Sequence, residues 1–93
     1  MEDGLRVDYT VHIWKEGDQF VGCALPLDVT SSGRTPDEAR RAVSEAVRLF
    51  LATARDMGTL PTLLEECGYV RHGDQWTAPD FVAFERHSEV VAS

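Results

Sequence analysis

Apolar and polar residues alternate over residues 5–14, which read LRVDYTVHIW. A period of two is typical of a β-strand with one buried face, so we predict a strand here. The apolar face would carry Leu5, Val7, Tyr9, Val11 and Ile13, and the outward face Arg6, Asp8, Thr10, His12 and Trp14.

The next two segments predict that the chain begins with an antiparallel meander. Residues 15–18, KEGD, are typical of a hairpin turn, in which Gly17 can adopt a positive φ. Residues 19–25, QFVGCAL, then predict a second strand, and Pro26 favours a bend or an edge position at its end. Residues 27–30 predict a short third strand.

A long helix is predicted from Pro36 to about Met57. Thr35 can accept a hydrogen bond from the backbone N–H three residues on, Glu38 can reach back, and Pro36 suits the first helical position. Gly58 suits the end of the helix. The apolar stripe has three-and-four spacing: Ala39, Ala42, Val43, Ala46, Val47, Phe50, Ala54 and Met57.

The remaining segments complete a β-β-β-α-α-β order in a single domain, residues 1–93, whose sheet and long helix occupy residues 5–58. A short helix is predicted over residues 60–67, then a loop or irregular hairpin from residue 69, and a last strand over residues 80–91, DFVAFERHSEVV. We therefore expect an α+β fold. An antiparallel sheet of three meander strands plus a C-terminal strand would be covered on one face by the long helix.

Charge and cysteine usage narrow the class of partner. Sixteen acidic residues against nine basic ones give a net charge of -7, which disfavours nucleic-acid binding and favours a basic protein partner. No apolar run is long enough for a membrane span, and the N-terminus does not resemble a signal peptide. Cys23 and Cys67 lie far apart without CxxC spacing, so we expect free thiols and a cytoplasmic location.

Residue spacing gives no metal or cofactor site. His12, His72 and His87 have neither i, i+4 pairing nor cysteine partners, so we expect no metal. Cys23 lies in a predicted strand and Cys67 on the apolar side of the short helix, and both are expected to be core thiols and not nucleophiles.

Asp8 keeps one enzymatic alternative open. Nucleases of the ribonuclease H architecture hold a metal-binding carboxylate in the middle of their first strand. Two-metal chemistry needs several converging carboxylates, and the other candidates, Asp28 and Glu45, have no demonstrable geometry. Outward alternation of Asp8 is the simpler interpretation, and we expect no enzymatic activity and no catalytic residue.

Trp14 is the most conspicuous residue of the outward strand face. Aromatic residues are enriched where proteins meet, so Trp14, together with Asp8 and His12, forms the candidate partner-binding set. The alternative is a ring packed on its neighbours at a sheet edge. Trp76 lies in the loop-like stretch and is expected to pin that stretch to the core.

Residues 27–51, LDVTSSGRTPDEARRAVSEAVRLFL, combine a short strand, a Gly-x-Thr-x-x-Glu-Ala turn and a striped helix. With the strand DQFVGCALP before it, this segment resembles the HicB family of antitoxins over most of residues 7–57. The resemblance implies a partial ribonuclease H-like layer, β-β-β-α-β. The matching residues are Leu27, Asp28, Val29, Gly33, Thr35, Glu38, Ala39, Ala46 and Leu49.

The resemblance also implies a function. HicB-type proteins are not enzymes; they bind a small basic HicA-like toxin, a ribonuclease with a double-stranded-RNA-binding-like fold, and cover its active surface. Family members usually add a helix-turn-helix or ribbon-helix-helix domain, but nothing after residue 70 has that basic helical character. The alternative is a stand-alone domain that serves as an adaptor or ligand binder without a toxin. In either case we expect a homo-oligomer, a dimer or tetramer, because a small sheet with exposed edges gains from pairing.

Overall fold

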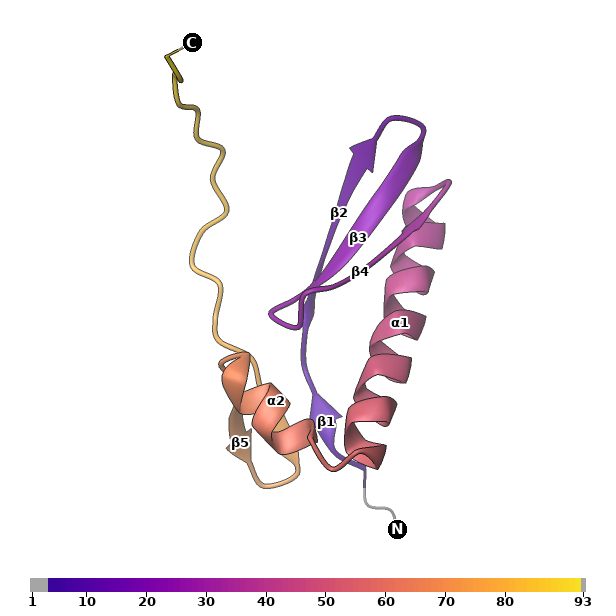
Figure 1. The fold of residues 1–93 in the computed structure, drawn as a ribbon, viewed down its shortest axis with the longest axis vertical. Coiled ribbons are helices and arrows are strands. Elements are labelled where there is room, and N and C mark those ends of the chain that lie inside the picture. Colours follow the sequence, from indigo (N-terminus) through magenta and orange to yellow (C-terminus); the bar gives the residue numbers. More distant parts are fainter. Residues whose placement is uncertain (1–3, 93) are drawn as a thin grey trace.

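The computed structural model describes residues 4–92 and has the predicted α+β architecture (Figure 1). Three antiparallel strands, β2, β3 and β4, are covered on one face by the long helix α1. The elements are β1 (Arg6–Val7), β2 (Thr10–Glu16), β3 (Gln19–Leu25), β4 (Val29–Gly33), α1 (Pro36–Asp56), α2 (Leu60–Glu66), β5 (Val70–His72) and β6 (Gln75–Thr77).

The meander forms as predicted, with one shift at its third strand. Gly17 has a φ of 59° in the turn between β2 and β3, which confirms the hairpin. The third strand begins at Val29 and not at residue 27, because Asp28 adopts a left-handed φ of 62° and its N–H donates to the Ala24 carbonyl at 2.7 Å. This turn uses up the first two residues of the predicted strand.

The predicted strand over residues 5–14 divides into β1 and β2, which take part in different sheets. β2 pairs with β3, whereas β1 pairs in parallel with β6, with Val7 opposite Trp76. The Asp8 N–H donates to the Trp76 carbonyl at 3.3 Å, so the chain changes partner at this point. The second sheet has the order β1-β6-β5.

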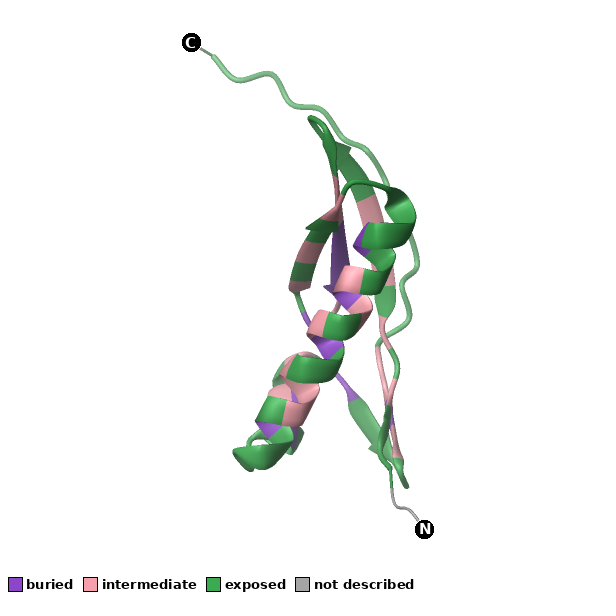
Figure 2. Cartoon of the chain, turned by 90° about the vertical axis from the view of Figure 1, so that its right-hand side faces the viewer, coloured by how far each residue is buried: buried purple, intermediate pink, exposed green. Residues whose placement is uncertain are grey.

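The prediction of a last strand over residues 80–91 was wrong. The C-terminal strands β5 and β6 lie in the stretch that was expected to be a loop or irregular hairpin, joined at Gly73, whose φ is 61°. Residues 78–92 have no regular structure, and no strand of the described chain pairs with them in a ladder. They run along the side of the sheet opposite α1 (Figures 1 and 2).

The start of α1 follows the predicted capping pattern. Thr35 Oγ1 accepts from the Glu38 N–H at 3.0 Å, and Pro36 is the first helical residue. The Glu38 carboxylate reaches back to the N–H of Arg34, one residue before the cap, at 2.9 Å. Gly33 is required just before this cap, since a Cβ there would lie 2.7 Å from the backbone nitrogen of Ala39.

One face of α1 lies on the sheet and contributes buried residues to the core (Figure 2). The contact is close at Gly22, where a Cβ would lie 2.5 Å from Cγ2 of Val43. The buried residues of the helix are Ala39, Val43, Val47 and Ala54. The sheet side therefore depends on a small residue in the middle of β3.

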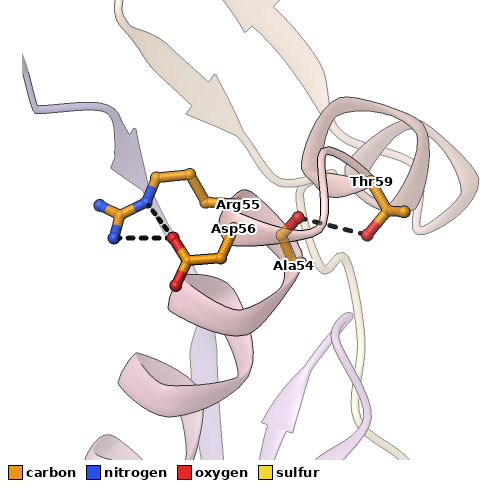
Figure 3. Close-up of polar contacts among 4 residues, drawn as sticks. All are labelled: Ala54, Arg55, Asp56 and Thr59. Carbon is orange, nitrogen blue, oxygen red and sulfur yellow. Dashed lines mark hydrogen bonds and ion pairs between the residues drawn. The ribbon is translucent and has the colours of Figure 1, made fainter.

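A tight junction joins α1 to α2 (Figure 3). Gly58 has a φ of 74°, as suits the position after a helix end, and Thr59 Oγ1 donates to the Ala54 carbonyl at 3.3 Å. The Arg55 guanidinium lies 3.4 Å from the Asp56 carboxylate at the exposed side of this end. The junction sets α2 so that its buried residue Leu64 joins the core.

Trp76 extends that core to the second sheet. Its side chain is only 2% exposed and packs in one cluster with Leu60, Leu64 and Tyr69, so the expectation that it pins this stretch to the core is confirmed.

No helix among residues 4–92 is long and apolar enough to cross a membrane.

Candidate binding face

The face of the β2-β3-β4 sheet opposite α1 is the candidate site. Side chains alternate along a strand, and Gly22 and Ala24 lie against α1, so their neighbours in β3 point to the other face. We call this surface the open face. It consists of Thr10, His12, Trp14 and Glu16 of β2, Val21, Cys23 and Leu25 of β3, and Thr30 and Ser32 of β4.

Trp14 is the largest side chain on the open face. It is 42% exposed, as its outward position predicted, and it lies opposite Val21 of β3. Its indole Nε1 donates to the Glu16 carboxylate at 3.1 Å. The ring therefore offers apolar surface to a partner while its N–H is already satisfied, which is a favourable state for an aromatic contact residue.

His12 lies two residues from Trp14 on the same face and meets the C-terminal segment. Its ring centroid is 4.3 Å from that of Phe84, with the planes tilted by 56°. Phe84 in turn lies 5.4 Å from Phe81, centroid to centroid. The C-terminal segment thus borders the open face beside His12.

Asp8 does not lie in the ladder that carries His12 and Trp14. It lies between β1 and β2, where its carboxylate accepts from the Gln75 amide at 2.9 Å and its carbonyl accepts from the Tyr69 hydroxyl. Asp8 and Asp80 both line a shallow hollow at the start of β2. Of the three predicted contact residues, His12 and Trp14 therefore come together, and Asp8 contributes negative charge at the end of the face.

The carboxylates of the nuclease alternative do not converge. Asp28 lies in the turn after β3, with its Oδ1 3.8 Å from the Cys23 sulfur, and Glu45 is exposed on α1. Within residues 4–92, no three His, Cys, Asp or Glu side chains form a group that could hold a metal ion. We therefore consider the open face as a surface for protein contact.

Cys23 is buried and Cys67 is half-buried. Burial raises the pKa of the Cys23 thiol, and the nearby Asp28 carboxylate adds to the effect. Burial also raises the pKa of Cys67, followed by the charge of Glu66. A raised pKa keeps a thiol protonated and weakly nucleophilic, in agreement with the predicted role as core thiols.

Comparison with known proteins adds no relative: no family model, curated protein or solved structure matches the chain. The function must therefore be inferred from the surface of this chain.

Sequence reasoning missed three residues of the candidate site. Alternation along the second strand could have predicted Val21 and Leu25, because Gly22 and Ala24 face the helix and their neighbours must face away from it. Phe84 gave no such signal, because its position beside His12 joins segments 72 residues apart in the chain.

Proposed function

We propose that this protein is a non-catalytic, antitoxin-like binding module that neutralises a small basic ribonuclease by protein-protein contact. The observation that carries the proposal is the open face: a sheet surface that no helix of residues 4–92 covers, with a half-exposed Trp14 on its edge strand β2 and the apolar Val21 directly opposite. Aromatic side chains in such positions commonly supply much of the free energy of binding.

Charge supports the choice of a basic partner. The chain carries a net charge of -7, and carboxylates lie at both ends of β2, Asp8 and Asp80 at its start and Glu16 at its end. Such an arrangement attracts a positively charged protein and speeds the encounter. The same charge repels nucleic acid, so the proposed protein acts on the ribonuclease and not on the RNA substrate. The proposed location of this action is the cytoplasm.

The order of elements also supports the proposal. After the meander and α1, β6 returns parallel to β1. The meander β2-β3-β4 followed by α1 corresponds to the β-β-β-α part of the order implied by the resemblance to HicB antitoxins, whereas β1, α2, β5 and β6 form an additional part with its own sheet. The resemblance is what suggests a ribonuclease as the partner, and the open face is where we place the contact.

The test is binding to a HicA-like toxin encoded beside this chain's gene. Wild-type protein is expected to suppress the toxicity and to co-purify with the toxin. Trp14→Ala should weaken the affinity, measured by calorimetry, by at least about tenfold. Leu5→Ala is the matched control, because Leu5 is 43% exposed but lies outside the open face. Failure of wild-type protein to bind or rescue, or equal affinity of the Trp14 variant, would overturn the proposal.

The alternative, a stand-alone oligomeric domain, is favoured by a different observation. Large apolar side chains are exposed along the C-terminal segment, among them Val82, Phe84 and Val90. Such a protein would self-associate without any toxin, and its expression would then not suppress the toxicity of a HicA-like protein. Self-association is compatible with either function.

A further inference from the structure

The C-terminal segment has the composition of a strand but no partner in its own chain. Residues 78–92, which we call the arm, carry the Phe and Val content that predicted a strand, yet no ladder includes them among the described residues. Val82 is 95% exposed, so it makes almost no contact with its own chain. The backbone groups of this exposed segment bond to water, and pairing with another strand would replace that water while burying the Phe and Val side chains.

The free edge of β4 is an available place for such a strand. β4 pairs with β3 on one side, and no other described strand pairs with it. Natural edges are commonly protected by charged residues or proline, but β4 reads VTSSG and has neither. Its outer row of backbone N–H and C=O groups is thus open to an incoming strand.

Helix α1 provides an apolar floor next to that edge. The helix packs mostly on β4 and β3 and least on β2, so it is displaced toward the β4 edge. Beside it lies a groove of about 620 Å³, lined among others by Val29, Ala46, Leu49, Phe50, Met57 and Leu63. Leu49 is 63% exposed there. Of β4, only Val29 lines the groove, so a strand paired with β4 would reach these side chains at its Val29 end.

The arm does not lie in the groove of its own chain. The arm runs along the side of the sheet opposite α1 (Figure 1). Phe84 of the arm contacts His12 there, whereas the groove is lined by α1. Fifteen extended residues span about 50 Å, enough to leave one copy and cross a second. The arm and the groove are therefore complementary surfaces that can meet between two copies.

We propose that two copies of this chain exchange arms, each arm adding as a further strand to the free edge of β4 in the other copy and packing Val82 and its apolar neighbours on the groove. The arrangement is closed and symmetric, since every arm and every groove is used once. It rests on the arm and the groove alone, and toxin binding at the open face can fail without affecting it.

Light scattering after size-exclusion chromatography at micromolar concentration tests the exchange with the full chain. Wild-type protein is expected at twice the monomer mass of 10.4 kDa. Val82→Lys in the arm and Leu49→Asp in the groove should each halve the measured mass. Val70→Asp is the control: Val70 is 57% exposed on β5 and belongs neither to the arm nor to the groove lining, so the variant should stay dimeric. Circular dichroism checks that every variant is folded.

Mixing the two monomeric variants distinguishes exchange from other dimers. A mixed dimer has one docking site with two wild-type surfaces. Its second site pairs the arm that carries Val82→Lys with the groove that carries Leu49→Asp, so a new positive charge meets a new negative one. The mixture is therefore expected to regain the dimer mass. A monomeric wild type, a dimer that ignores both substitutions, or a mixture that stays monomeric would each overturn the proposal.

Discussion

The two tryptophans lie in regions with opposite properties. Trp76, in the second sheet, is buried in the core, yet its Nε1 has no hydrogen-bond partner within residues 4–92. Trp14, on the open face, is exposed, yet its Nε1 is bonded to Glu16. In the inner region, the Trp76 ring is packed although its N–H is unpaired. On the open face, the Trp14 N–H is paired although much of its ring is exposed. We infer that the first region maintains the fold and that the second is suited to contact.

Removal of Trp76 should have the largest effect on stability. Trp76→Ala leaves a large cavity between Leu64 and Tyr69 and is expected to lower the free energy of unfolding by about 3–5 kcal/mol. Trp76→Phe is the control: it keeps most of the ring and removes the unpaired N–H, so its effect should be much smaller. Urea unfolding followed by circular dichroism measures both. Equal losses for the two variants would contradict the packing role.

The helix side of the sheet should respond to added volume almost as strongly. Gly22→Val places methyl groups where the Val43 side chain already lies, and we expect a loss of about 3 kcal/mol in the free energy of unfolding. Ser32→Val places the same side chain on the exposed open side of β4 and should change stability by less than about 0.5 kcal/mol. Similar unfolding midpoints for the two variants would remove the distinction between the faces.

The pH dependence of stability tests the inner region through Tyr69. Burial, with smaller effects from Cys67, Asp8 and Tyr9, raises the pKa of Tyr69 to about 12 from 10.0. The folded state therefore favours the neutral phenol, and this contribution is present below pH 10 and lost as the pH rises toward 12. Unfolding at pH 9 and pH 12 should show a loss of about 2 kcal/mol that is absent in Tyr69→Phe. An identical pH profile for the variant would show that another group is responsible.

Local patterns predicted the elements that depend on neighbouring residues. The hairpin at Gly17 and the cap at Thr35 follow from turn and helix-start chemistry within a few residues. The late start of β4 is a local failure at the Asp28 turn, and the larger failures involve distant partners. Strand β1 pairs in parallel with β6 and is therefore not part of the meander. Residues 80–91 have strand propensity but no paired strand in the described chain, and propensity alone does not form a sheet.

The candidate site divides in the same way. Alternation placed His12 and Trp14 on one outward face, which the structure shows. Asp8 belongs to the same alternation, but its bond to Gln75 draws it to the second sheet. Neither that bond nor the contact of Phe84 with His12 could be read from local sequence, because each needs the path of the chain after residue 69.

Truncation of Trp14 should have the smallest effect on stability. The ring is half exposed, and its loss removes few contacts with the core, so Trp14→Ala is expected to lower the free energy of unfolding by less than about 1 kcal/mol. The same substitution should weaken the proposed toxin binding, so stability and affinity would separate at this residue, whereas at Trp76 both would fall together. Urea unfolding and calorimetric titration on one preparation measure both quantities. A loss of stability as large as that of Trp76→Ala would assign Trp14 to the core and leave the open face without its main contact residue.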